Sequence, residues 1–307
     1  MKKIKFCSLF LILFGAYFIS CHKEGIYRPK QKIQQFSMEK VRFYAGDQIG
    51  EKEFYKEYWK WENKLLRSVR RESAAGTETM IMTYDGKKIR SIDIGNNKVS
   101  FSYKNGKIDK IESKGGGSYT KIIVDLRDKG DIVQLRYELS GNALENKNSF
   151  DQTISDLLAI NRMIMPGHPS EIIHESFMEQ KNAIMTSKTE IAIVLVTLQY
   201  NGNNIGKQTI ENRSTNIKQV YNYTYDAKKS PFFYSFMELL EPTGTGVPLF
   251  CSQNNIISSY EERNSSVVTK YKYEYNEDDY PVKCEIKTTF DPDFPSDYSL
   301  ETWIYVY

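Results

Sequence analysis

The sequence has 307 residues, of which 26% are charged and 40% hydrophobic, so it predicts a globular protein of one large domain or two ordinary ones. The formal net charge is +3, but Lys2, Lys3 and Lys5 lie in a predicted signal segment; without them, 39 of the 42 basic residues remain against 39 acidic ones. A neutral chain excludes a strongly basic nucleic-acid binder and gives no long-range attraction to anionic partners.

Residues 1–20 are predicted to be a secretory signal. Three lysines precede an apolar run over 6–19, which is too short to span a bilayer as a helix. The run ends in Ser20 and Cys21, a small residue before a cysteine, which resembles a bacterial lipobox. Cleavage before Cys21 is expected to leave a lipidated N-terminal cysteine that anchors the protein stably on a membrane. The alternative is an ordinary signal peptide followed by an incidental cysteine.

Residues 21–36 are predicted to form a tether, because they are polar, contain Pro29 and lack a periodic pattern. Residues 37–307 contain no convincing linker. They are expected to form a single β-rich domain, or two fused lobes over 37–150 and 189–307 with a helical insertion between them.

An internal repeat runs through the first half of this domain. In each copy an aromatic or apolar residue is followed by two aliphatic residues three positions apart, with a polar turn between, at 61–69, 84–92, 103–111 and, with one inserted residue, 126–132. Asp-Gly and Asn-Gly make the tight turns that join antiparallel strands, and the flanks alternate apolar and polar residues. Each copy therefore predicts a β-hairpin, and successive hairpins are expected to pair into an antiparallel meander.

The middle of the chain has a different pattern. Apolar residues recur at helical spacing in 151–165, and Pro166 would end a helix there. A helical insertion around 151–180 is therefore expected to cover one face of the sheet. Residues 189–200 are rich in β-branched side chains and predict a strand.

The alternating pattern returns toward the C-terminus. Tyrosines occupy every second position in 221–225 and 271–275, and a polar turn follows each run. Residues two apart share one face of a strand, so both runs predict half-buried strands with an aromatic face and a polar face. Residues 303–307 are apolar or aromatic at every position, which predicts a central or covered strand.

These hairpins and the lipobox resemble a large group of uncharacterised Bacteroidetes lipoproteins, whose hairpins are similar to tyrosine-aspartate (YD) repeats. The likeness covers most of the mature chain, is weakest over 140–190, and is carried by runs at 59–65, 83–89, 102–108, 221–232, 253–256 and 275–281. Two positions depart from the group, since Ser230 replaces the usual Asn and Asp279 a common Gly. The resemblance implies an antiparallel β architecture and an envelope location, and it carries no activity.

Members of that group at the cell surface carry a charged stretch after the lipidated cysteine, which only Lys23 and Glu24 match here. The predicted location is therefore the outer membrane, lipid-anchored, with the cell surface and the periplasmic face both open.

The sequence nominates no catalytic centre, cofactor or metal site. It contains no P-loop, no G-x-G-x-x-G and no G-x-S-x-G. His168 and His174 are six residues apart and do not share one helical face, so solvated histidines are the preferred interpretation. Cys251 and Cys284 leave two alternatives open, a disulfide or two separate buried thiols.

The 22 tyrosines are the remaining signal. Their expected role is core packing, because aromatic residues fit a pleated, half-buried face. The functional alternative is an exposed aromatic face that binds carbohydrate, with Trp59 and Trp61 on one strand face as the candidate ligand-binding residues.

The sequence thus favours a noncatalytic outer-membrane lipoprotein that binds a ligand or partner, or acts as an envelope scaffold, and that binds no nucleic acid. Its expected partners are the membrane, through the lipid at Cys21, and a carbohydrate or an envelope protein. The alternative is an envelope hydrolase acting on glycan or peptide, which needs carboxylates or histidines that converge in a cleft.

Overall fold

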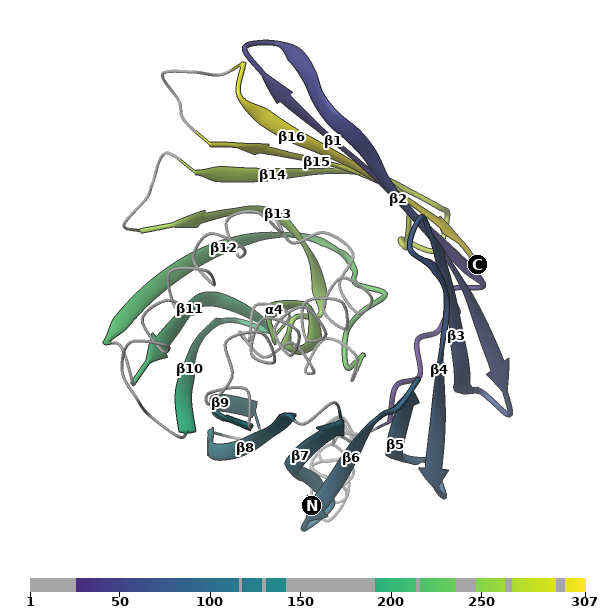
Figure 1. The fold of residues 1–307 in the computed structure, drawn as a ribbon, viewed down its shortest axis with the longest axis vertical. Helices are drawn as coiled ribbons and strands as arrows, with labels where there is room; N and C mark the ends of the chain where they lie inside the picture. The colour runs from purple at the N-terminus through teal and green to yellow at the C-terminus, as the bar shows by residue number, and fades with distance from the viewer. Residues whose placement is uncertain are drawn as a thin grey trace, which may run out of the picture.

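The computed structural model describes residues 26–115, 118–128, 131–141, 191–213, 216–235, 247–262, 267–290 and 296–307. These residues form a closed antiparallel barrel in which each strand pairs with its neighbours in the sequence and the first strand pairs with the last (Figure 1). The elements are β1 (Gln35–Tyr44), β2 (Asp47–Glu62), β3 (Leu65–Ser73), β4 (Gly76–Asp85), β5 (Lys88–Ile94), β6 (Asn97–Lys104), β7 (Lys107–Gly115), β8 (Ser118–Asp128), β9 (Asp131–Gly141), β10 (Ile191–Asn201), β11 (Asn204–Asn212), β12 (Ile217–Lys229), α4 (Val247–Cys251), β13 (Asn254–Glu261), β14 (Val268–Tyr275), β15 (Pro281–Thr289) and β16 (Tyr298–Val306).

The predicted mainly β, antiparallel fold is confirmed. The four copies of the repeat are the turns of the hairpins β2–β3, β4–β5, β6–β7 and β8–β9, and the strand expected over 189–200 is β10. Both expected lobes belong to one sheet, because β9 pairs with β10 across them. The helical insertion expected around 151–180 lies outside the described residues.

The β6–β7 turn shows why the repeat contains Asn-Gly. Asn105 and Gly106 have φ values of 51° and 81°, both in the left-handed region. A two-residue turn with positive φ at both positions follows the right-handed twist of the flanking strands, and Asn and Gly adopt that conformation at the lowest cost.

A β-bulge lies opposite the aromatic residue of several hairpins. The strand register shifts at Trp61, Tyr84, Tyr103 and Tyr200, and the extra residue is on the following strand each time: Arg67, Arg90, Asp109 and Gly206. The bulged strand bends at this residue, beside the turn of the hairpin.

The aromatic residues opposite these bulges hydrogen-bond to the preceding part of the chain. The Tyr84 hydroxyl donates to the Leu66 carbonyl at 2.6 Å, and the Tyr103 hydroxyl donates to the Ile89 carbonyl at 2.7 Å. Three further aromatic residues make the same kind of bond to a backbone carbonyl, as Trp61 to Ile33, Tyr200 to Ile132 and Tyr307 to Pro281. The aromatic residue of the repeat therefore joins its hairpin to the preceding part of the chain by a hydrogen bond.

Replacing Tyr103 with phenylalanine should remove one such bond and lower the free energy of unfolding by about 1 kcal/mol. Urea unfolding should show a lower midpoint with an unchanged slope. Tyr260→Phe is the matched control, because Tyr260 is 42% exposed on β13, and it should leave the midpoint unchanged. Equal midpoints for the two variants would remove the fastening role from the Tyr103 hydroxyl.

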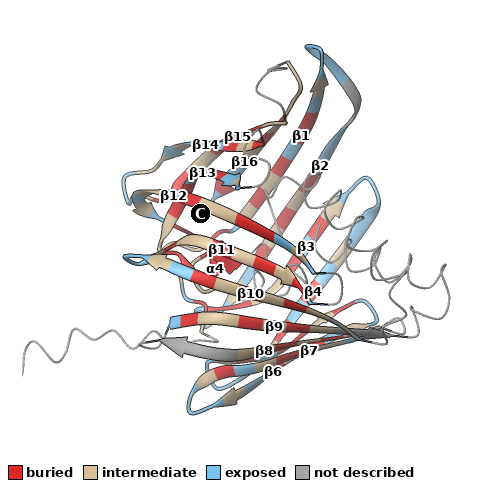
Figure 2. Ribbon diagram, turned by 90° about the vertical axis from the view of Figure 1, so that its left-hand side faces the viewer, coloured by how far each residue is buried: buried red, intermediate tan, exposed pale blue. Residues whose placement is uncertain are grey.

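Buried and more exposed residues alternate along the strands of the barrel wall (Figure 2). The buried side chains are mainly apolar, and many of the more exposed ones are charged. On β1, buried Phe36 and Met38 alternate with Ser37 and Glu39, which are more exposed. Ion pairs between residues two apart on one strand follow the outer face, as Lys60–Glu62, Arg70–Glu72, Lys110–Glu112, Arg136–Glu138, Arg213–Glu211 and Lys283–Glu285. The outer wall is therefore suited to water.

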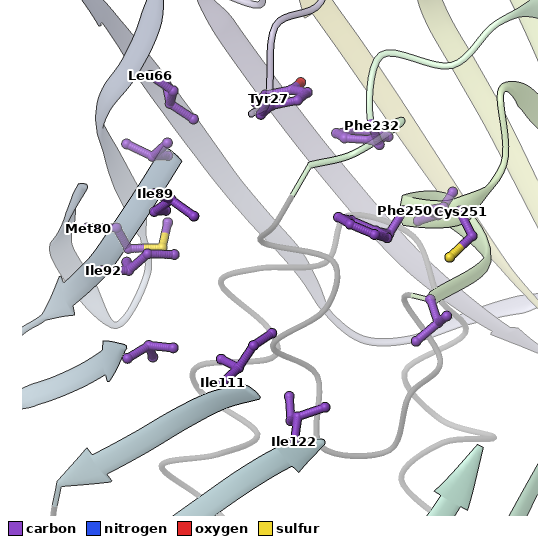
Figure 3. Close-up of a cluster of buried hydrophobic side chains, with 14 of the residues drawn as sticks. Tyr27, Leu66, Met80, Ile89, Ile92, Ile111, Ile122, Phe232, Phe250 and Cys251 are labelled. Atoms are coloured by element: carbon purple, nitrogen blue, oxygen red, sulfur yellow. The ribbon is translucent and has the colours of Figure 1, made fainter. Parts of the chain in front are cut away.

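One end of the lumen is filled by three pieces of the chain, named here the plug: residues 26–34, residues 230–235 and α4. Tyr27, Phe232 and Phe250 point into the lumen beside wall residues such as Leu66 and Ile89 (Figure 3). Backbone and side-chain bonds join the three pieces, because the Tyr27 hydroxyl donates to the Pro231 carbonyl at 2.5 Å and the Tyr234 amide donates to the Phe250 carbonyl at 2.9 Å.

The plug corrects the predicted tether over 21–36. Tyr27 and Ile33 are fully buried against the barrel core, and β1 begins at Gln35. The polar composition of the segment concealed these two anchors. The part of the chain before Tyr27 is all that is left for a tether.

Candidate functional site

The other end of the lumen is lined by buried polar side chains, named here the polar belt. Each lies on the inner face, in the half of its strand away from the plug: Lys40, Arg71, Thr120, Asn212, Gln219, Ser259, Thr269, Thr288, Ser299 and Glu301. The inner wall thus changes along the barrel axis from apolar at the plug to polar at the belt. Burying polar groups costs free energy unless they are hydrogen-bonded, so this belt calls for an explanation.

Strand register arranges the charged members in two rows across the wall of β16, β1, β2, β3 and β4. In the first row Lys40 is aligned with Glu301 on one side and Glu53 on the other. The second row has the same order of charges, with Arg71 aligned between Glu57 and Glu78. Each row consists of a base between two acids. The second acid of each row, Glu53 in the first and Glu78 in the second, is less buried than the other two members.

The Glu57–Arg71 pair is the tightest contact in the two rows. Arg71 Nε donates to Glu57 Oε1 at 2.9 Å, and Arg71 Nη2 donates to the same oxygen. The second oxygen of Glu57 accepts from the indole of Trp59 at 2.9 Å. Burial raises the pKa of Glu57, while Arg71 and Trp59 oppose that rise. The contacts with Arg71 and Trp59 therefore stabilise the charged form of Glu57, which burial disfavours.

Lys40 and Glu301 form a second buried pair. Their Nζ and Oε1 atoms are 3.4 Å apart, and both side chains are 3% exposed. Burial raises the pKa of Glu301, and Lys40 is the strongest opposing influence. Breaking either buried pair would leave an uncompensated charge, which is far more costly than breaking a surface pair.

Tyr55 lies between the two pairs. It is 6% exposed, and the guanidinium of Arg71 lies 4.3 Å from the centre of its ring. Its hydroxyl makes no hydrogen bond of ordinary geometry within the described part of the chain, and Arg71 is its nearest candidate donor. Burial raises the pKa of Tyr55 well above the ordinary value, with Arg71 opposing and Glu57 and Glu301 adding to the rise, so the hydroxyl is protonated and able to donate.

The sequence-predicted candidates lie elsewhere. Trp59 is 5% exposed and Trp61 half-buried, and they stack on the inner face with ring centres 6.3 Å apart. Tyr27 packs against both rings, and the Trp61 indole donates to the Ile33 carbonyl. The two residues share one face as expected, but they do not form an exposed aromatic platform for a ligand.

Cys251 and Cys284 are both buried, and no disulfide joins them in this structure. Cys251 ends α4 in the plug, whereas Cys284 lies on the inner face of β15. Burial raises the pKa of the Cys284 thiol, which makes it a poor nucleophile. Cys21, His168 and His174 lie outside the described residues.

Among the described side chains, no group of three or more His, Cys, Asp or Glu residues is placed to hold a metal ion. No helix within the described ranges has the length and apolar character needed to cross a bilayer.

Sequence reasoning missed the polar belt, although a signal for it exists. Phe36, Met38 and Lys40 occupy alternate positions of one strand, so the lysine lies on the same face as the two apolar residues. Glu301 shares a face with Trp303 and Tyr305 for the same reason. A charged residue in the apolar phase of a strand is a candidate for a buried, paired group.

These features define a closed antiparallel barrel with a charged outer wall, a plug at one end and a polar belt at the other. No family model matches the sequence, and no curated protein is similar to it. Among solved structures, a porin-like protein from Bacteroides uniformis ATCC 8492 superposes with a TM-score of 0.53 at 10% identity, covering 91% of this chain and 99% of that one. A porin-like protein from Bacteroides vulgatus ATCC 8482 gives a TM-score of 0.44 at 9% identity, covering 90% and 98%, which is too loose to carry an argument. The first likeness shows that the two proteins share a fold.

Proposed function

We propose that this protein is a noncatalytic binding protein of the bacterial envelope. A lipid on Cys21 holds it on the outer membrane, its barrel stands in water, and its lumen receives a ligand or partner at the polar belt. The observation that carries the proposal is the polarity of the wall: ion pairs follow its outer face, and the apolar core residues lie on its inner face at the plugged end.

That polarity is the reverse of a membrane-spanning barrel. Strands that cross an outer membrane carry an apolar band about 25 Å tall on the outside and polar residues inside. Here the outer wall carries ion pairs such as Lys60–Glu62 and Arg70–Glu72, and the plug fills part of the lumen. The porin-like description of the B. uniformis protein therefore supports an outer-membrane setting in this proposal, without making the present barrel a pore.

The short distance along the chain between Cys21 and the plug favours one orientation of the barrel on the membrane. Six peptide units separate Cys21 from Tyr27, and a fully extended chain spans at most about 3.6 Å per residue, so Tyr27 would lie within roughly 20 Å of a lipidated Cys21. Tyr27 belongs to the plug. The plugged end would then face the bilayer, and the polar belt would face away from it into water.

Cell fractionation of full-length protein and of Cys21→Ala tests the anchor. Wild-type protein should remain with the membranes and partition into detergent, whereas Cys21→Ala should appear folded in the aqueous fraction. Cys251→Ala is the matched control, because a buried plug thiol should not affect partitioning. A Cys21→Ala protein that still resists carbonate extraction from the membrane would contradict the proposal.

Protease treatment of intact and lysed cells decides between the two faces of the membrane. Digestion in intact cells places the barrel at the cell surface, and protection until lysis places it in the periplasm. Either result is compatible with the anchored barrel, but only the first allows the capture of external polysaccharide.

A further inference from the structure

The Tyr55 hydroxyl, whose hydrogen has no acceptor among the described residues, marks a specific point on the inner wall. Strand register aligns Tyr55 with Met38, and Met38 with Trp303, in a row between the two charged rows. A buried hydroxyl without a hydrogen bond is unfavourable, and native structures usually supply a partner from the protein, water or a ligand. The hydroxyl therefore has donor and acceptor capacity left for a bound molecule.

Charged side chains of both signs surround this point and are nearly balanced. Among the described inner-face side chains of these strands, four acids and three bases differ by one negative charge: Glu53, Glu57, Glu78 and Glu301 with Lys40, Arg42 and Arg71. Glu57 and Glu301 are already paired with bases at 2.9 Å and 3.4 Å. An ionic ligand of either sign would meet like charges in both rows and would have to displace an existing partner.

A neutral hydroxyl group matches this balanced set of charges better than an ion does. It can accept from Tyr55 or a lysine and donate to a carboxylate oxygen at the same time. The rest of the polar belt offers the same mixed chemistry, because its uncharged members carry hydroxyl or amide groups, among them Thr269, Thr288 and Ser299. The described side chains also offer no cluster for a metal ion.

The charged rows extend from buried positions to solvent. Glu53 is exposed and Glu78 is half-buried, whereas Lys40 and Glu57 in the same rows are buried. A ligand that enters the lumen at the polar belt would meet Glu53 and Glu78 first and the region around Tyr55 next. In the orientation proposed above, this end faces away from the membrane.

We infer that the wall around Tyr55 is a saccharide-binding site, in which sugar hydroxyl groups complete the hydrogen bonds of Tyr55 and of the two charged rows. The inference rests on the proposed binding function and names the chemical class of its ligand.

Calorimetric titration with a panel of neutral oligosaccharides of glucose, galactose, mannose and xylose tests this inference. Tyr55→Phe should weaken binding of whichever saccharide the wild-type protein binds by about tenfold, since losing a hydrogen bond of about 1.4 kcal/mol changes an equilibrium constant by that factor. Tyr58→Phe is the matched control, because Tyr58 lies on the outer face of the same strand and its affinity should equal that of wild type.

Urea unfolding separates this role from a structural one. Tyr55→Phe removes an unsatisfied buried hydroxyl, so it should leave the unfolding midpoint unchanged or slightly raised while affinity falls. Equal saccharide affinity in wild type and Tyr55→Phe would overturn the inference, as would a panel without any binding at millimolar concentration. Saturable binding of spermidine that depends on the Tyr55 hydroxyl would overturn the neutral class of ligand. None of these outcomes affects the membrane anchor, which the Cys21→Ala fractionation measures independently.

Discussion

Replacing Arg71 with alanine is expected to destabilise the barrel by about 3–5 kcal/mol, among the largest effects of any single substitution in the wall. The change leaves the buried carboxylate of Glu57 without the guanidinium that contacts its Oε1 atom. It also removes the group that lies over the Tyr55 ring. The measurement is urea unfolding of the Cys21→Ala protein, which avoids detergent.

Two further variants identify the cause of that loss. Arg70→Ala is the matched control, because Arg70 is the next residue on the same strand, faces outward and pairs with the exposed Glu72, so its loss should cost about 0–1 kcal/mol. The double variant Glu57→Leu with Arg71→Met removes both charges and should recover most of the stability lost in Arg71→Ala. Similar losses for Arg71→Ala and Arg70→Ala would show that the buried pair is not needed for folding.

The hairpins were predictable because their signals are local. Asn105 and Gly106 specify a turn by their own conformational preferences, and the alternation around them specifies the strands. The hydrogen bond from Tyr103 to the Ile89 carbonyl explains why an aromatic residue recurs at a fixed distance from the next turn. The repeat therefore encodes both the hairpin and its attachment to the neighbouring hairpin.

Closure of the barrel could not be read from the same pattern. The closing pair joins Phe36 to Tyr305, residues far apart in the sequence, and any open meander satisfies the same local alternation. Closure also decides which aromatic residues are covered. Trp59 and Trp61 were placed correctly on one face, but only the position of Tyr27 shows that this face is inside the barrel and packed.

The site was missed for a related physical reason. Lys40 and Glu301 look like ordinary surface charges when each strand is considered alone. Their pairing at 3.4 Å becomes visible only when β1 and β16 are adjacent. The same holds for Tyr55, because only the closed barrel shows that its hydroxyl is buried without an acceptor among the described residues.

Phe36 and Phe54 provide a direct test of the orientation of the wall, because they are the same residue type on paired strands and opposite faces. Phe36 is fully buried, with ring centres 5.2 Å from Tyr305, 5.9 Å from Trp303 and 6.4 Å from Phe232 of the plug. Phe54 is 51% exposed on the outer face of β2. Phe36→Ala should therefore cost about 3–5 kcal/mol, and Phe54→Ala should change stability by less than about 0.5 kcal/mol.

The ratio of these two effects, measured by urea unfolding of the Cys21→Ala protein, distinguishes a barrel in water from a barrel in lipid. In water the stability of the wall comes from its inner face, and Phe36 also connects that face to the plug through Phe232. In lipid the outer face would be the apolar one, and an outward phenylalanine would contribute to stability through its contact with the bilayer. A loss at Phe54 as large as that at Phe36 would therefore reverse the assigned polarity and, with it, the argument that a water-exposed barrel presents its polar belt to a soluble ligand.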